Sequence, residues 1–404
     1  MRIAFIVEVF PKLSETFILN QITGLIDEGH EVEIFPSRRF LENKIHPKVM
    51  KYGLMHRTFS PPHLPQNKLV AKLKCIGYVL KNTEKIEIIS KILSSKAPVT
   101  YKIDLFFRLL PFLERAPFDI IHCHFGTMGN IAINAKNLGV FKGKMILSFY
   151  GYDATRYRLD AGYYKNIIPH FDVFITISNY LKEKIIKLGF PQEKITTIPI
   201  GVNLDDFVYQ KNSRKQSGIK LLTVARLVEK KGVYYGIMAF SKIQSANSGL
   251  EYHIIGDGPL FIPLQELIDK LKLQNKVFLH GALDQEEVKE YYQSAAIFVL
   301  PSITASDGNT EGQGLVLQEA QAMEIPIIAT FHNGIPEGVV DGETGFLVPE
   351  RDISALSERM NTLIQDRDLR VKMGQKGRDL VMNSFDNRKL VRRISELYKG
   401  LYKS

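Results

Sequence analysis

The stretches RIAFIVEVF (2–10), SETFILNQITGLIDEGH (14–30) and EVEIFP (31–36) open the chain and decide its fold. The first and third are short runs rich in β-branched and aromatic residues, whereas the stretch between them repeats its apolar residues at helical spacing. A strand, a helix and a strand in this order form a β-α-β unit. Such units predict parallel strands that are covered by helices.

The same alternation continues along the chain in two series that a polar linker separates. The further strand-like runs are DIIHCHF (119–125), KMILSFYG (144–151), DVFITIS (172–178), KITTIPI (194–200), KLLTVA (220–225), EYHIIG (251–256), KVFLHG (276–281), AIFVLP (296–301) and PIIAT (326–330). A chain of 404 residues also exceeds what one hydrophobic core usually supports. We therefore predict an α/β protein with two doubly wound parallel-sheet domains, at 1–200 and 218–385, that face a cleft. Residues 201–217 form the linker, and 386–404 form a basic helix that crosses both domains or lies on a membrane.

The composition is that of an ordinary globular protein, with 45% hydrophobic and 24% charged residues. Cys75 and Cys123 are too few for a disulfide framework and lack metal-site spacing, which favours a reducing cytoplasm. The apolar run at the N-terminus is too short for a signal peptide, and no run of about 18 apolar residues follows. We expect a soluble or peripheral protein.

Residues 51–116 hold twelve lysine and arginine residues against four acidic ones, which accounts for most of the net charge of +10. A solvated basic face, a surface for anionic lipid headgroups and a nucleic-acid site are all compatible with this excess. Apolar residues interleave with lysines in KLVAKLKCIGYVLK (68–81), and no nucleic-acid motif accompanies them. We favour a membrane surface and no nucleic acid.

Candidate site residues follow the strands of the second series, where ligands of parallel sheets bind. In TEGQGLVLQEAQA (310–322), the glycines expose backbone amides at the start of a helix, which is an anion site. Glu311 and Glu319 offer hydroxyl acceptors, although a loop end and a surface residue would give the same pattern. Arg226 and Lys231 supply the countercharge for a diphosphate, whereas we expect Glu229 and Lys230 to face solvent.

Five segments in this order and spacing resemble the retaining GT-B glycosyltransferases of family 4, over nearly the whole chain: TVARLVEKKG (223–232), HIIGDGPL (253–260), VFLHGALDQEEVKEYYQSAAIFVLPS (277–302), TEGQGLVLQEAQA (310–322) and GIPEGVVDGETGFLVP (334–349). PKLSETFILNQ (11–21) is similar to the exopolysaccharide branch, of colanic-acid type. The resemblance implies two Rossmann-like domains and metal-free transfer of a hexose from a UDP- or GDP-sugar, with no cofactor.

The resemblance also implies a role for each donor-side residue. Arg226 and Lys231 hold the diphosphate, Glu311 contacts the transferred sugar and Glu319 contacts the ribose. The segment around them would complete the donor site, with Gly312, Gln313, Gly314 and Leu315 at the helix start. Gly256 and Gly258, in a tight turn of the GDGP segment, would border the nucleotide.

On the acceptor side the chain departs from the family twice. Relatives commonly have a Gly-Gly loop after the first strand, where this chain has Lys12 and Ser14. Tyr150 replaces a family histidine; it can donate to a sugar hydroxyl but does not titrate near neutral pH, and a purely packed aromatic remains an alternative. Asp153 and Arg156 follow at the same strand end and could contact either substrate.

His122 and His124 share a strand face, but neither has a third metal ligand nearby in sequence, so we expect no metal site. Imidazoles that line the core or the cleft without any chemistry are the alternative for both residues. The resemblance implies that His124 lies in the cleft on the acceptor side, because related sequences carry a similar H-x-H-F segment there.

The favoured function is transfer of a hexose to a saccharide acceptor in the synthesis of cell-surface polysaccharide. The basic segment suits a polyprenyl-diphosphate-linked acceptor, with the enzyme peripheral to the inner face of the cytoplasmic membrane. Two alternatives stay open: an inactive protein that binds nucleotide sugars or assembles a complex, and a GT-B sugar-nucleotide epimerase.

Overall fold

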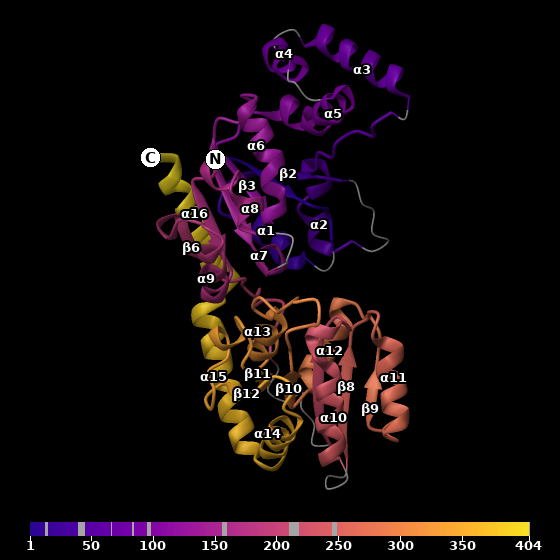
Figure 1. Ribbon diagram of the computed structural model, residues 1–404. Coiled ribbons are helices and arrows are strands. Elements are labelled where there is room, and N and C mark those ends of the chain that lie inside the picture. Colours follow the sequence, from indigo (N-terminus) through magenta and orange to yellow (C-terminus); the bar gives the residue numbers. More distant parts are fainter. Residues whose placement is uncertain are drawn as a thin grey trace.

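The computed structural model describes residues 1–12, 15–38, 45–65, 67–82, 85–94, 98–155, 160–209, 218–244 and 249–403. Within these ranges it contains two parallel six-stranded sheets with helices on both faces (Figure 1). This architecture confirms the predicted fold class. The strands consist of runs of buried, often β-branched residues. A parallel sheet requires such runs because helices cover both of its faces.

The first sheet has the strand order β2-β1-β3-β4-β5-β6. Its strands are β1 (Arg2–Val7), β2 (Glu31–Pro36), β3 (Ile120–His124), β4 (Lys144–Phe149), β5 (Val173–Thr176) and β6 (Ile195–Thr197). The α-helices of this part are α1 (Thr16–Asp27), α2 (Pro47–Lys51), α3 (Lys68–Lys81), α4 (Ile86–Ser94), α5 (Val99–Arg115), α6 (Gly129–Asn137), α7 (Tyr152–Thr155), α8 (Ala161–Tyr164) and α9 (Asn179–Lys187).

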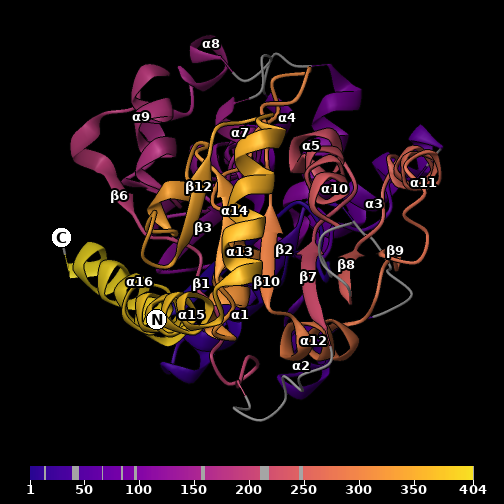
Figure 2. The same cartoon turned by 90° about the horizontal axis from the view of Figure 1, so that it is seen from below.

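The second sheet has the order β12-β11-β10-β7-β8-β9, and the succession from β10 to β9 can be followed in Figure 2. Its strands are β7 (Ile219–Val224), β8 (Leu250–Ile255), β9 (Val277–Leu279), β10 (Ile297–Leu300), β11 (Ile327–Thr330) and β12 (Gly345–Val348). The remaining α-helices are α10 (Val233–Ile243), α11 (Phe261–Lys270), α12 (Gln285–Ser294), α13 (Leu315–Ala322), α14 (Ile353–Gln365), α15 (Arg367–Ser384) and α16 (Asn387–Lys403). Strand β12 was not predicted, because GFLV lies in a glycine-rich stretch.

The chain passes between the two domains twice, and the two crossings are bonded to each other. The amide of Val202 donates to the carbonyl of Phe385 at 2.8 Å, and the amide of Asn387 donates to the carbonyl of Val202 at 3.0 Å. Both crossings therefore form one short two-stranded hinge.

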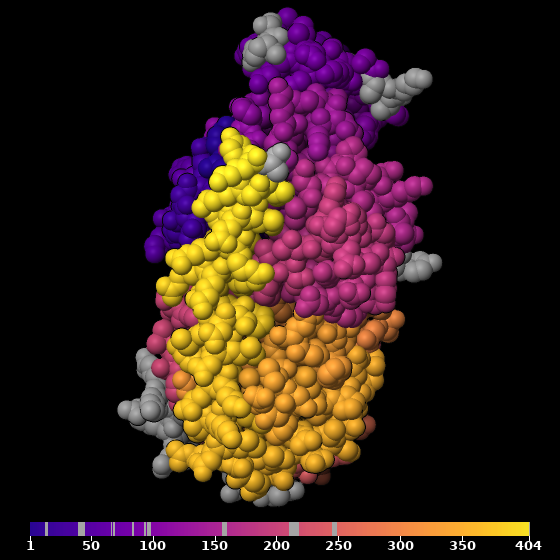
Figure 3. Space-filling view, turned by 90° about the vertical axis from the view of Figure 1, so that its left-hand side faces the viewer, coloured from indigo at the N-terminus to yellow at the C-terminus, as the bar shows by residue number. Residues whose placement is uncertain are grey.

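Helix α16 lies along the N-terminal domain, as the yellow segment in Figure 3 shows. Its apolar stripe, which includes Leu390, Val391 and Tyr398, is buried in the core of that domain. The Tyr398 hydroxyl bonds to Nδ1 of His122 at 2.5 Å. Of the two predicted placements, the helix thus takes the one that crosses back to the N-terminal domain.

Candidate active site

Glu311 lies in a cluster of opposite charges just before α13. The Lys231 ammonium forms an ion pair with its carboxylate, and each side chain is only 12% exposed. Burial raises the pKa of Glu311, but Lys231 and Lys230 outweigh it and hold the pKa at about 2. Glu311 is therefore ionised at neutral pH, and both of its carboxylate oxygens can accept hydrogen bonds from hydroxyl groups.

Lys230 was expected to face solvent, but the structure places its side chain against the loop before α13. Its ammonium donates to the carbonyl of Thr310 at 2.9 Å, and burial lowers its pKa. The expectation was wrong because residues 229–231 form a short 3₁₀ turn that folds against the loop before α13. Glu229 is exposed, as expected.

Arg226 follows β7 and extends into solvent from the same turn. Within the described part of the chain, its guanidinium makes no hydrogen bond or ion pair. It lies near enough to Lys230 to lower the pKa of that lysine. Arg226 is thus an exposed cation beside the Glu311 cluster.

The N-terminus of α13 has no side-chain cap on its first amides. Its cap residue Gly314 has a φ of 77°, a conformation that glycine adopts without strain, and Leu315 begins the helix. Gly312 lies against the other domain, because a Cβ at this position would come within 2.7 Å of the carbonyl oxygen of Tyr150. The two domains therefore meet at the start of α13.

Glu319 faces a different partner from Glu311. The hydroxyl of the buried Tyr292 donates to its carboxylate at 3.0 Å, and burial raises the pKa of Glu319 to about 7. The two glutamates, eight positions apart in the sequence, are therefore acceptors of unlike protonation. Tyr292 was missed by the sequence analysis, and its place in the helical EEVKEYYQS pattern gave no sign of this contact.

Gln313 does not face the donor site, contrary to the sequence analysis. Its side chain accepts from the amide of Ile200 at 2.8 Å and donates to the carbonyl of Ile200 at 2.9 Å. The residue is 3% exposed. It binds the C-terminal domain to the chain just before the hinge.

Gly256 and Gly258 pack against the turn that carries Arg226. A Cβ at Gly256 would lie 1.9 Å from the carbonyl oxygen of Ala225, and one at Gly258 would lie 2.5 Å from that of Leu227. These contacts are backbone to backbone, so only glycine fits at either position. The GDGP segment thus fixes the position of the Arg226 turn.

His332 is a site residue that the sequence analysis did not select. Its Nε2 accepts from the backbone amide of Glu311 at 3.2 Å, while Nδ1 bonds to the Glu350 carboxylate at 2.6 Å. Because Nε2 must accept, the proton sits on Nδ1 and points at Glu350. The available signal was the polar segment His332–Gly334, which begins one residue beyond the buried strand β11.

The side chains of Tyr150 and His124 bond to each other within the N-terminal domain. The Tyr150 hydroxyl bonds to Nδ1 of His124 at 2.7 Å, and its ring packs on Phe17 and Phe125. His124 has no exposed surface. The predicted contacts of these two side chains with substrates are therefore corrected: the backbone carbonyl of Tyr150, not its hydroxyl, faces Gly312.

Asp153 is also buried, and its carboxylate is already hydrogen-bonded to backbone amides. Its carboxylate accepts from the amides of Tyr150, Gly151 and Gly126 at 3.0, 2.8 and 3.0 Å, and burial raises its pKa to about 6. This corrects the expected contact with a substrate. Asp153 instead shapes the loop that meets Gly312.

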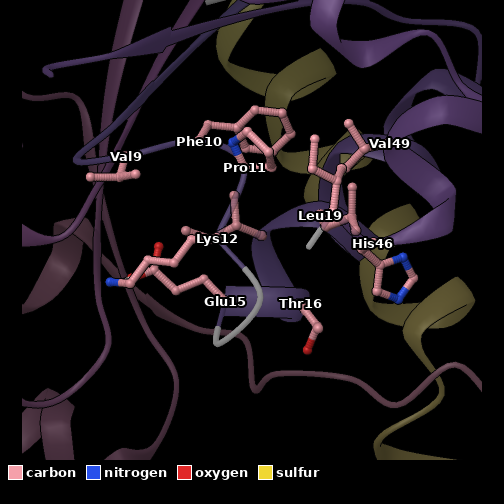
Figure 4. Close-up of a pocket in the computed structure, with 11 residues that line it drawn as sticks. Val9, Phe10, Pro11, Lys12, Glu15, Thr16, Leu19, His46 and Val49 are labelled. Carbon is pink, nitrogen blue, oxygen red and sulfur yellow. The ribbon is translucent and has the colours of Figure 1, made fainter. Parts of the chain in front are cut away.

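Lys12 lines a narrow pocket after β1, where its ammonium pairs with Glu15 (Figure 4). The pocket walls are mostly apolar and include Phe10, Pro11 and Val49. Glu15 occupies the N-cap position of α1. Ser14 and Arg156 lie outside the described residues.

Within the described ranges, no group of three histidine, cysteine or acidic side chains could hold a metal ion.

Comparisons with known proteins agree with this arrangement. The family model described as Glycosyltransferase Family 4 matches residues 14–206, and the model described as Glycosyl transferases group 1 matches residues 206–380. The amylovoran biosynthesis glycosyltransferase AmsK of Erwinia amylovora is 33% identical over 99% of this chain and 100% of its own. WcaL of Escherichia coli K12, a glycosyltransferase assigned to colanic acid biosynthesis, is 32% identical over the same shares.

Two solved structures share the fold. A glycosyltransferase from Rickettsia africae has a TM-score of 0.74 at 21% identity, covering 100% of this chain and 99% of its own. Anabaena HepE in complex with UDP and glucose has a TM-score of 0.72 at 15% identity, covering 99% of this chain and 100% of its own. The chain thus has the GT-B fold and belongs to the family 4 (group 1) glycosyltransferases.

Proposed function

We propose that this glycosyltransferase moves a hexose from a UDP- or GDP-linked sugar to a saccharide acceptor in exopolysaccharide synthesis. The relatives named for colanic acid and amylovoran biosynthesis support the exopolysaccharide acceptor. One observation carries the donor class: the ionised Glu311 lies between two lysines and beside the uncapped N-terminus of α13.

The donor diphosphate would lie between Arg226, Lys231 and the amides at the start of α13. Helix N-termini and cations both stabilise phosphate charge, so this corner supports a doubly charged diphosphate. The same charges would stabilise the leaving nucleoside diphosphate during transfer, an electrostatic effect worth several kcal/mol in enzymes. No metal ion is needed in this scheme, and we propose metal-independent transfer with retention of configuration.

The two glutamates would bind hydroxyl groups of the sugar and of the ribose. Glu311 would accept hydrogen bonds from hydroxyls of the transferred hexose, and Glu319 from the ribose. Burial raises the pKa of Glu319 to about 7, and ribose hydroxyls that donate to the carboxylate would favour its ionised form and so lower this pKa.

We further propose that the acceptor is lipid-linked and that α3 docks the enzyme on an anionic membrane. Helix α3 lies at the end of the N-terminal domain farthest from the C-terminal domain (Figure 1). Leu69, Leu73, Ile76 and Leu80 recur on it at helical spacing and are 64, 59, 55 and 74% exposed. Lys72, Lys74 and Lys81 are exposed on the same helix and suit anionic headgroups. Among the described residues, no helix has the length and apolarity to span a bilayer.

Transfer is tested with radiolabelled sugar nucleotides and a saccharide acceptor extract. We expect the wild type to transfer one of them and the Glu311→Ala variant to lose this activity. Binding without turnover in the wild type would instead support an inactive nucleotide-sugar-binding protein. Release of an epimerised sugar nucleotide in the absence of acceptor would support an epimerase.

Membrane docking is tested by sedimentation with vesicles of phosphatidylglycerol and phosphatidylcholine. We expect binding that grows with the anionic fraction and weakens with salt, because screening shortens the reach of the lysines. A Leu73→Gln, Leu80→Gln double variant should bind less, whereas Ile262→Gln serves as the control. Ile262 is 63% exposed on α11 of the other domain. Binding insensitive to both lipid charge and salt would contradict the proposal.

A further inference from the structure

The loop between β10 and α13 carries Glu311 and is long for its position. It spans residues 301–314, whereas a strand-to-helix loop of this fold usually has about two to six residues. A loop of this length has many conformations, and its backbone must be fixed before Glu311 can lie in one place. The groups that fix it therefore matter for the site.

Residues 229 and 230 bind this loop at three points. The amide of Ile303 donates to the carbonyl of Lys230 at 2.8 Å. The amide and hydroxyl of Ser306 donate to the Glu229 carboxylate at 3.0 and 2.7 Å. The Lys230 ammonium donates to the carbonyl of Thr310 at 2.9 Å.

The third contact lies next to the site itself. Thr310 directly precedes Glu311 and is 7% exposed. Because the residue is buried, few water molecules can hydrogen-bond to its carbonyl in place of Lys230. To reach this carbonyl, the Lys230 side chain loses hydration of its ammonium and rotamer entropy. A lysine that stays exposed to solvent avoids both costs. At the same time the charge of Lys230 attracts the Glu311 carboxylate.

We propose that Lys230 is a positioning residue, which fixes the Thr310 carbonyl and thereby the place of the Glu311 carboxylate. The inference rests on the proposed contact of Glu311 with the transferred sugar. Lys230 acts on the loop, whereas Lys231 and Arg226 would meet the diphosphate. The loss of Lys230 should therefore disturb the sugar end of the donor more than the nucleotide end.

The test compares Lys230→Met, Lys230→Arg and Glu311→Ala with the wild type. The measurements are kcat and KM for the sugar nucleotide that the wild type transfers, and Kd for UDP and GDP. Lys276→Met is the matched control, because the Lys276 ammonium also donates to a backbone carbonyl, that of Gln244, at 2.7 Å. Lys276 directly precedes β9, at the edge of the sheet opposite the site.

For Lys230→Met we expect kcat to fall between about tenfold and about 100-fold, the usual cost of a catalytic group displaced by about 1 Å. The Kd for the nucleoside diphosphate should stay within about twofold, because that ligand lacks the sugar. Lys230→Arg should recover most of the activity, since arginine can also donate to the carbonyl. Lys276→Met should behave like the wild type.

The remaining outcomes would contradict either the positioning role of Lys230 or the proposed role of Glu311. Wild-type kinetics in Lys230→Met would overturn the inference, and so would a Kd for UDP or GDP that weakens as much as kcat falls, since Lys230 would then bind phosphate directly. Failure of Lys230→Arg to recover activity would also count against positioning by the hydrogen bond. If Glu311→Ala transfers sugar like the wild type, the proposed role of Glu311 fails instead.

Discussion

Replacing Glu311 with glutamine should destabilise the protein, because it removes the anion that Lys230 and Lys231 share. Glutamine keeps the size of the side chain and its ability to accept hydrogen bonds. The change therefore isolates the charge, and it leaves two partly buried ammonium groups without a counterion.

The magnitude follows from the pKa of Glu311, which lies at about 2 instead of 4.5. Since one pKa unit corresponds to about 1.4 kcal/mol, the ionised carboxylate contributes about 3 kcal/mol to folding at neutral pH. For a group whose folded pKa is lowered, this contribution is complete above the unfolded pKa. It disappears as the pH falls from about 4.5 towards 2.

Thermal unfolding at about pH 7 measures this loss. A free energy of about 3 kcal/mol corresponds to a decrease in Tm on the order of 6 to 12 °C for a domain of this size. Glu343→Gln is the matched control: Glu343 pairs with Lys376 at 2.9 Å, but the two side chains are 58 and 44% exposed. Such an exposed pair contributes at most about 1 kcal/mol.

A Tm for Glu311→Gln within about 2 °C of the wild type would refute the electrostatic argument. An equal loss in both variants would refute it as well, because burial of the pair would then make no difference.

Three further predictions follow from other contacts. Affinity for the sugar nucleotide should rise with pH through about 7, where Glu319 ionises, and Glu319→Gln should remove this dependence in a titration of Kd against pH. Gly312→Ala should lower transfer at least about tenfold while Gly400→Ala does not, because the new methyl group meets the Tyr150 carbonyl at 2.7 Å, whereas a Cβ at Gly400 meets open space. Tyr150→Phe should reduce the unfolding free energy by about 1 to 3 kcal/mol in denaturant titrations and leave the Kd for UDP and GDP unchanged, since its hydroxyl bonds to the buried His124 rather than to a ligand.

Much of the fold could be predicted because it rests on local patterns. The β-branched runs gave eleven of the twelve strands, and the polar residues after them gave the edge of the sheet where Glu311 and Arg226 lie. These predictions need only the spacing of apolar residues along the sequence and the rule that the carboxyl ends of parallel strands lie at the same edge of a sheet.

The directions of the side chains could not be predicted in the same way. The residue types of Gln313, Asp153 and Lys230 show what they can bond to, but not which partner is within reach. Gln313 meets Ile200 and Lys230 meets Thr310, contacts between residues 113 and 80 positions apart.

The sequence by itself therefore determined the two sheets, their order along the chain and the charged groups available at the site. The tertiary structure alone decided which of these groups face the cleft and in which protonation state. The reason is that burial and partner distance set both properties. At Glu311 and Glu319, the same residue type is held at a pKa of about 2 by two lysines and raised to about 7 where burial outweighs a single tyrosine hydroxyl.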